Sequence, residues 1–254
     1  GSKFHIKSGS WLAADMFIDC KGIQVITDGK SQGKPCAPDN KKYGGDVLAE
    51  HIVVKFVYET VTNPRTTVDV IYSVENTGKI TVSVSYKGVK GLPQLPVFGL
   101  RFIMPTLADK YMYEGLSGET YPDRMAGGVK GVYEINDLSL TPYLVPQECG
   151  MRMGTDWLEV TRHTSLNNSR KDNSAQILRI EKKEDTFAFS CLPYTASEIE
   201  NATHHEELPP ARRTVLCIYG AVRGVGGIDS WGSDVEDAYH IDAEKDITYS
   251  FVIC

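Results

Sequence analysis

The stretch TTVDVIYSVENTGKITVSVSYKG (66–88) decides the fold class of this chain. In its first part (66–74) and again in its last part (79–88), every other residue is apolar, and most residues in between are polar. A side-chain period of two is typical of a β-strand with one face on a hydrophobic core and the other in water. The residues that join the two parts, Glu-Asn-Thr-Gly (75–78), are typical of a turn. The stretch therefore predicts an antiparallel β-hairpin.

Strand patterns recur over most of the chain, whereas helix patterns are rare. Further strands are expected in 50–61, 98–105, 185–192, 213–222 and 246–254. Many strands separated by turns favour an all-β fold, here one large antiparallel β-sandwich. We expect a single domain over 3–254, preceded by a Gly-Ser pair (1–2) that is typical of a remnant of tag removal.

One segment, YTASEIENATHHEEL (194–208), carries a helix signal. Thr195 and Glu198 have the spacing of a capping box, in which each side chain satisfies a backbone N–H of the first helical turn. We expect a short helix of about two turns near 196–204. The histidines and glutamates at 204–207 do not have the spacing of a zinc site, so no metal ion is predicted there.

The composition restricts the partners of the chain. Its 254 residues carry a net charge of −6, with 41% hydrophobic and 24% charged residues, which is typical of a soluble globular protein. An acidic chain lacks the basic face that nucleic acids require and the polybasic patch that anionic membranes attract. Since the chain has no run of about 18 apolar residues, no membrane span is predicted either. No signal-peptide pattern is visible.

The six cysteines are scattered through the chain, without a Cys-x-x-Cys pair. This spacing matches neither a zinc site nor the framework of a small disulfide-bonded domain. We therefore expect reduced thiols, most of them packed in the interior.

The stretch GVGGIDSWGS (224–233) places a large apolar side chain in a segment too rich in glycine to form a strand or a helix. Trp231 either packs back onto the core or is presented to another molecule. Gly226 and Gly227 permit positive φ angles and the close approach of another domain. Asp229 and Ser230 can accept backbone N–H bonds and so hold the loop in shape.

Four motifs occur in an order and at a spacing that identify a family. They are YPDR (121–124), PYLVPQECGMR (142–152), TASEIENATHHEEL (195–208) and GVGGIDSWG (224–232). From about Pro93 to its end, the chain resembles the C-terminal domain of the large bacterial β-galactosidases of the LacZ type, which are retaining glycoside hydrolases.

The resemblance implies a many-stranded antiparallel supersandwich, similar to galactose mutarotase, that folds back against a catalytic TIM barrel. It also implies that the glycine-rich loop carries Trp231 to the rim of the active site, where the indole stacks on the sugar in the leaving-group position. A flat aromatic ring covers the apolar C–H face of a sugar at low entropic cost.

The chemistry itself is expected elsewhere. Hydrolysis with retention needs two carboxylates about 5–5.5 Å apart. In the family both are glutamates of the barrel, so the resemblance implies no catalytic residue, cofactor or metal ion in this chain. Divalent and monovalent cations of the parent enzyme would bind at its barrel. The implied partners are a galactoside and the catalytic domain, within a homo-oligomeric enzyme of the bacterial cytoplasm or periplasm.

The chain departs from the family pattern at several places. Ile228 and Cys149 stand where the family usually has Asp and Asn, and the segment 115–124 is shorter than usual. The Arg-Ala-Pro…Asn-Asp motif near the start of the family domain is absent. We therefore expect that the chain begins partway into the domain or has diverged at its N-terminal end.

The segment 111–162 is rich in Tyr, Pro, Gly and charge and shows little alternation, a pattern that indicates either functional loops or regular elements that are not recognised as such. Asp123, Arg124, Glu148 and Arg152 lie in it and are expected to form buried ion pairs that hold these loops together. For these four residues a structural role is favoured over catalysis.

Two other functions remain as alternatives. The chain could be an independent carbohydrate-binding module with a sugar groove of its own. It could also be a mutarotase-like epimerase, which would need a histidine and a carboxylate that converge on the sugar ring. His51, His163 and His240 are candidates for that histidine, although none of them lies in a motif.

Overall fold

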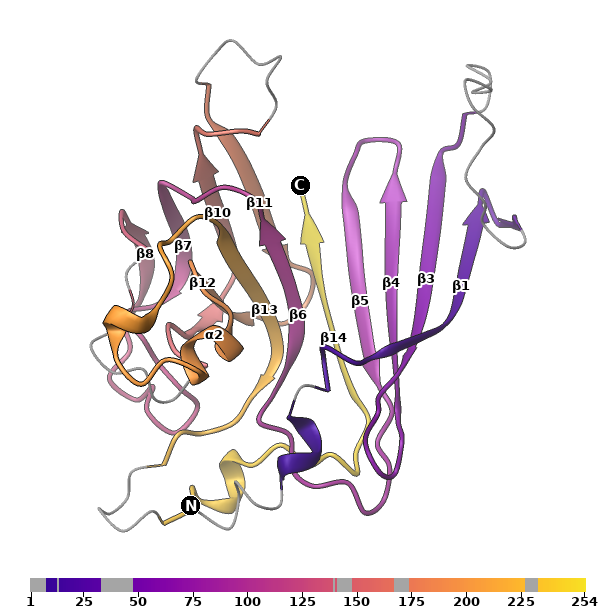
Figure 1. The fold of residues 1–254 in the computed structure, drawn as a ribbon. Coiled ribbons are helices and arrows are strands. Elements are labelled where there is room, and N and C mark those ends of the chain that lie inside the picture. Colours follow the sequence, from indigo (N-terminus) through magenta and orange to yellow (C-terminus); the bar gives the residue numbers. More distant parts are fainter. Residues whose placement is uncertain are drawn as a thin grey trace.

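The fold of this chain is an antiparallel β-sandwich. The computed structural model describes residues 8–12, 14–32, 48–138, 140, 148–166, 174–226 and 233–254. Within these ranges the strands form two sheets, and neighbouring strands in both sheets run antiparallel (Figure 1). The all-β sandwich predicted from the sequence is therefore confirmed.

The larger sheet has ten strands in the order β2-β1-β3-β4-β5-β14-β11-β10-β7-β8, and the smaller sheet has four strands in the order β6-β13-β12-β9. The strands of the larger sheet are β1 (Asp19–Thr27), β2 (Lys30–Ser31), β3 (His51–Glu59), β4 (Thr67–Glu75), β5 (Ile80–Tyr86), β7 (Lys110–Leu116), β8 (Lys130–Ile135), β10 (Trp157–Arg162), β11 (Gln176–Lys182) and β14 (Ile247–Ile253). Those of the smaller sheet are β6 (Val97–Met104), β9 (Arg152–Thr155), β12 (Phe187–Leu192) and β13 (Thr214–Val222).

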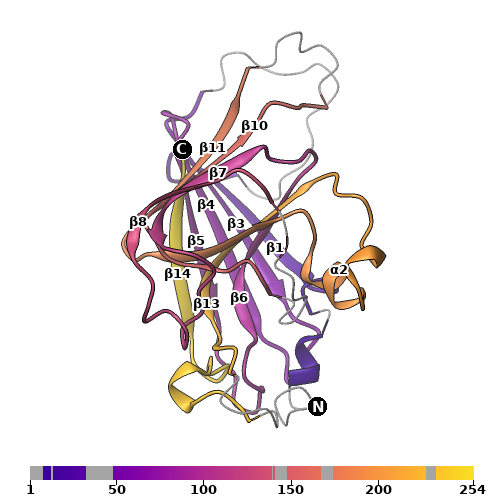
Figure 2. The same ribbon diagram turned by 90° about the vertical axis from the view of Figure 1, so that its left-hand side faces the viewer.

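The main hydrophobic core lies between the two sheets, which form two layers in Figures 1 and 2. The hairpin predicted over 66–88 is β4 and β5, and the alternate residues Val82, Val84 and Tyr86 are 0–2% exposed. Aromatic rings join the layers edge to face, as where Tyr113 on β7 meets Phe189 on β12 with ring centroids 5.2 Å apart. Such pairs add to the stabilisation that comes from buried area alone.

The other predicted strands are also present, as β3, β6, β12, β13 and β14. The sequence did not predict β1, β2 or β11. In β1 the register against β3 shifts between Cys20 and Gly22, and such an irregularity interrupts the period of two on which strand prediction depends.

Of the two interpretations of 111–162, unrecognised regular elements account for much of the segment, because β8, β9, β10 and most of β7 lie in it. In β7 the residues Tyr111, Tyr113 and Gly115 are buried and alternate with half-buried neighbours. Tyrosine and glycine hide the alternation, since neither is strongly apolar although both are buried here.

The helix is shorter than predicted. Helix α2 (Ala196–Glu200) is five residues long, and a separate 3-10 helix, η2, follows at His205–Glu207. The capping box is confirmed, because the Glu198 N–H donates to the Thr195 hydroxyl and the Thr195 N–H donates to the Glu198 carboxylate. Asn201 ends the helix with an N–H bond and a side-chain bond, at 2.7 Å, to the Ser197 carbonyl.

The described cysteines are free thiols, as expected: Cys149 and Cys191 are buried, Cys217 is half-buried, and Cys20 and Cys254 are exposed. Cys36 lies outside the described residues. Much of the loops expected at 31–45 and 165–174 also lies outside them. None of the described helices is long and apolar enough to cross a membrane.

Candidate functional site at the base of the glycine-rich loop

The candidate site is the glycine-rich loop that contains Trp231. Gly227, Asp229, Ser230 and Trp231 lie outside the described residues, so the roles expected for these four stay predictions. Both ends of the loop are described, at 223–226 and 233–235, and the site is built from the groups that hold these ends.

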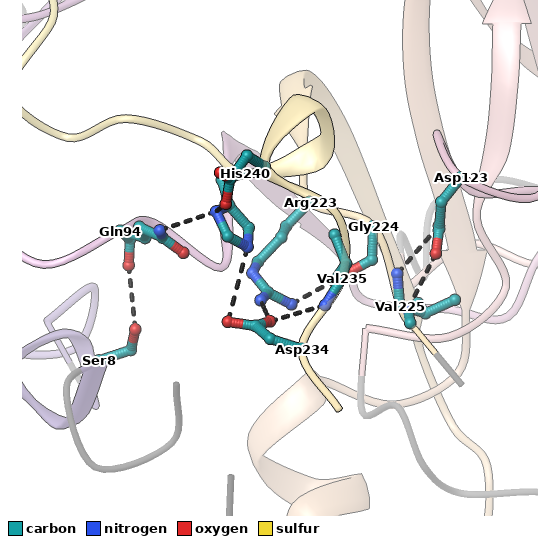
Figure 3. Close-up of polar contacts among 11 residues, drawn as sticks. Ser8, Gln94, Asp123, Arg223, Gly224, Val225, Asp234, Val235 and His240 are labelled. Carbon is teal, nitrogen blue, oxygen red and sulfur yellow. Dashed lines mark hydrogen bonds and ion pairs between the residues drawn. The ribbon is translucent and has the colours of Figure 1, made fainter. Parts of the chain in front are cut away.

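Asp123 holds the first end of the loop (Figure 3). Its Oδ1 accepts the backbone N–H of Val225 at 3.0 Å, and its Oδ2 accepts the N–H of Gly226 at 2.8 Å. Both oxygens of one carboxylate are therefore used on consecutive backbone amides. Charge-assisted bonds of this kind are stronger than those between neutral groups.

Arg124 holds the same end through a backbone carbonyl. Its Nε donates to the Gly226 carbonyl at 3.1 Å, and a second guanidinium nitrogen donates to the same oxygen. The N–H of Arg124 donates to the Tyr121 carbonyl at 2.8 Å, and this bond closes the turn that contains Asp123 and Arg124. The Tyr-Pro-Asp-Arg motif thus forms hydrogen bonds with a backbone segment about one hundred residues further along the chain.

Glycine is required at two positions of this end. Gly226 has a φ of +74°, which L side chains rarely adopt. A Cβ on Gly224 would lie 2.9 Å from Cγ of Asp123 and 2.9 Å from Cβ of Tyr239, too close for either neighbour. The Gly224 N–H also donates to the Tyr239 carbonyl at 3.0 Å. The first end of the loop is therefore packed tightly against its supports.

The second end is tied back to the first by an ion pair between Arg223 and Asp234 (Figure 3). The Asp234 carboxylate also accepts the N–H of Val235 at 2.8 Å. Partial burial alone would raise the pKa of Asp234, but the Val235 N–H and the Arg223 guanidinium outweigh it and lower that pKa. A Cβ on Gly226 would lie 3.6 Å from the Ser233 carbonyl oxygen, so the two ends are adjacent.

His240 extends the network toward the N-terminal segment (Figure 3). Its Nε2 lies 3.5 Å from the Asp234 carboxylate, and its Nδ1 lies 2.9 Å from Nε2 of Gln94. The Ser8 hydroxyl donates to the Gln94 carbonyl at 3.1 Å. The base of the loop is thus connected to the stretch of chain just before β6.

The ion pairs expected among Asp123, Arg124, Glu148 and Arg152 are not formed between these described residues, which have other partners. Glu148 accepts the Tyr219 hydroxyl at 3.1 Å, and burial raises the pKa of its carboxyl. The Arg152 guanidinium lies over the Tyr113 ring, 5.8 Å from its centroid. The expected ion pairs were wrong because sequence proximity does not bring these side chains together.

Sequence reasoning missed several residues of the site. Glu119 joins two of the family motifs, because its Oε1 accepts the Tyr121 hydroxyl at 2.7 Å and the Gly150 N–H at 2.8 Å. Arg223 and Asp234 were also missed. A signal for this pair existed, since opposite charges directly flank the stretch GVGGIDSWGS (224–233).

The histidines considered for an epimerase lie apart and bind separate partners. The His51 ring bonds the Ser73 hydroxyl at 2.6 Å, and Nδ1 of His163 lies 2.9 Å from the exposed Asp109 carboxylate. His240 belongs to the loop base. Over the described part of the chain, no three His, Cys, Asp or Glu side chains gather in a group that could hold a metal ion.

The fold and the site together define a class: an antiparallel β-sandwich that fixes a glycine-rich loop at one end by a carboxylate clamp and an ion pair. The chain belongs to the β-galactosidase small-chain family, since the family model described as "Beta galactosidase small chain" matches residues 7–253. The family resemblance seen in the four sequence motifs is thereby confirmed.

Individual relatives agree with this assignment. The chain is 56% identical over 253 residues to the β-galactosidase small subunit of Latilactobacillus sakei, a match that covers 100% of this chain and 80% of that one. It is 32% identical to the β-galactosidase of Halalkalibacterium halodurans and 34% identical to β-galactosidase BgaC of Bifidobacterium adolescentis. The chain spans only 22% and 21% of the length of these two proteins.

Proposed function

We propose that this chain is the small subunit of a β-galactosidase that hydrolyses terminal β-D-galactosides together with a large subunit. In this proposal the large subunit contains the catalytic barrel and both catalytic glutamates, and the small subunit contributes no catalytic residue, cofactor or metal ion. The support is the family membership and the share of the longer relatives that the chain spans, 22% and 21%.

The second part of the proposal is that the small subunit supplies Trp231 to the leaving-group sugar subsite. The observation that carries it is the construction of the loop base, where Asp123 and Arg124 grip Val225 and Gly226. Two charged side chains and an ion pair all hold the ends of one short loop. Supporting contacts of this kind are typical of a loop whose position matters for binding. A loop held at both ends presents its central side chain at low entropic cost.

The test compares Trp231→Ala with Trp231→Phe in the enzyme assembled from both subunits. Lactose has a glucose leaving group that can stack on the indole, whereas a small activated aryl galactoside does not have this sugar. Loss of an aromatic contact worth about 1–1.5 kcal/mol would lower kcat/KM for lactose about five- to thirteenfold. We expect this loss in the alanine variant, a smaller loss in the phenylalanine variant, and little change with the aryl galactoside.

The control is the thermal stability of each variant. Equal losses for lactose and the aryl galactoside, together with a lower Tm, would show that Trp231 packs into its own domain and would contradict the subsite. Unchanged kinetics for both substrates would contradict it as well.

A further inference from the structure

The larger sheet extends sideways beyond the smaller sheet (Figure 1). Burial falls along this extension. In β5 the residues Val82, Val84 and Tyr86 are buried, in β4 only Val70 is buried, and in β3 and β1 every residue is half-buried or exposed. The strands β1, β3 and β4 therefore have no second layer over them in the described structure.

The uncovered inner face is nevertheless apolar. The face of β5 that packs on the core continues across β4, β3 and β1. Along this face Val84 pairs with Val70, Val70 with Phe56, and Phe56 with Ile23. We call this surface the wing face. It includes Ile23, Val25, Val54, Phe56, Tyr58 and Tyr72.

The opposite face of the same strands mixes apolar side chains, such as Val53 and Val57, with polar and charged groups. Lys55 and Asp69 form an ion pair there at 2.6 Å, and His51 bonds Ser73. The wing face instead resembles the face of a sheet that packs on a core. A contiguous apolar surface of this kind marks a site that another structure covers.

A free strand edge lies beside the wing face. Strand β6 is at the end of the smaller sheet, and Phe98 on β6 packs on Tyr86 of β5 and Tyr249 of β14, with ring centroids 5.6 and 5.7 Å apart. At the other end, β12 next to β9 packs on β7 through Phe189 and Tyr113. Among the described strands β6 therefore has no neighbour on the edge that is turned toward β4, β3 and β1. Such an edge can be extended by an added strand.

The N-terminal segment of the described chain leads to this edge. Ser8 and Trp11 donate to the carbonyls of Gln94 and Pro93, just before β6 begins. Further along, Asp15 pairs with Arg101 of β6 at 2.6 Å, and the segment then continues into β1 (Figure 1). Residues 8–11 therefore lie beside the start of β6.

The same segment has exposed apolar side chains of its own. Leu12, Met16 and Phe17 are 79%, 62% and 64% exposed. Burial of these side chains would stabilise the fold, because it removes apolar surface from water. They belong to the segment that leads from the start of β6 to β1.

From these observations we infer that further strands of the same polypeptide pair with the free edge of β6 and cover the wing face in the complete small subunit. The inference rests on the small-subunit part of the proposed function and not on Trp231. The length of a relative supports it, since one fifth of the Latilactobacillus sakei small subunit lies outside its match with this chain. Strands added at β6 would bring the width of the four-stranded sheet closer to that of the ten-stranded sheet.

The test measures maleimide labelling of one introduced cysteine, with Cys20, Cys36 and Cys254 replaced by serine and the label on the introduced cysteine counted separately from that on Cys149, Cys191 and Cys217. Val54→Cys reports on the wing face, and Val53→Cys, its neighbour on β3, is the matched control on the opposite face. Each variant is prepared in chain 1–254 and in the complete small subunit encoded by the parent gene. We expect Val54→Cys to react at least tenfold more slowly in the complete small subunit, without any large subunit present. Val53→Cys should react at the same rate in both.

Three outcomes would overturn the inference. Equal rates for Val54→Cys in both proteins would show that the wing face stays open. Protection that appears only after the large subunit is added would identify that subunit as the cover. Protection in chain 1–254 that rises with protein concentration would identify a second copy of the chain. Labelling needs no catalytic activity, so a failed assembly of active enzyme would count against the proposed function alone.

Discussion

At the scale of single residues, Asp123 is the group on which the loop base depends most. Each of its two oxygens accepts one backbone N–H, from Val225 and from Gly226. An asparagine of the same shape has one acceptor oxygen and one donor nitrogen. In either orientation of the amide, one loop N–H would face a donor and lose its partner.

We therefore expect Asp123→Asn to lower the free energy of unfolding by about 1–3 kcal/mol, the cost of one buried, unpaired polar group. In the assembled enzyme, lactose turnover should fall more than turnover of an aryl galactoside, because the loop is no longer held. Chemical denaturation and steady-state kinetics measure the two effects.

Asp28→Asn is the matched control for this substitution. There a single oxygen, Oδ1, accepts both the Glu50 and the His51 N–H, so an amide oxygen can keep both bonds. If Asp123→Asn were no more destabilising than Asp28→Asn, the two hydrogen bonds that Asp123 accepts would contribute little to the stability of the loop base.

At the scale of elements, helix α2 depends on its capping box and on one ion pair. Oε2 of Glu198 accepts the Thr195 N–H at 2.8 Å and also pairs with Arg213 at 2.7 Å. Partial burial alone would raise the pKa of Glu198. The Thr195 bonds and the Arg213 guanidinium outweigh it and lower this pKa below its ordinary value of 4.5.

Because the pKa of Glu198 is lowered in the folded protein, ionised Glu198 stabilises the fold at pH values above its ordinary pKa. This stabilisation is lost as the pH falls through the pKa that Glu198 has in the folded protein. We expect Glu198→Gln to be less stable than the parent chain at pH 7 and the difference to shrink below about pH 4. Urea unfolding across this range measures it. Glu200→Gln, an exposed position of the same helix, is the control, and an equal pH dependence in both variants would contradict the assignment.

At the scale of the whole molecule, the proposed division of labour predicts how activity is distributed. This chain alone should not hydrolyse an aryl galactoside, and addition of the large subunit should restore activity in a saturable way. A heat-denatured sample of the chain is the control. Hydrolysis by the chain alone would contradict the division. Measurable lactose affinity of the chain alone, by calorimetry, would instead favour an independent carbohydrate-binding module.

The sequence by itself determined the features that depend on near neighbours along the chain. The period of two in 66–88 predicted β4 and β5, and the spacing of Thr195 and Glu198 predicted the capping box. The four ordered motifs identified the family. Periodicity and capping are local because the side chains involved lie only two to four residues apart.

Only the tertiary structure decided how the site is held together. Asp123 reaches Val225 and Gly226 because β-sheet packing brings two distant turns to one end of the sandwich. The tyrosine-rich strand β7 and the partners of Glu148 and Arg152 were likewise not predictable. Hydrogen bonds between distant segments depend on strand register and on the approach of backbones, and neither leaves a local pattern in the sequence.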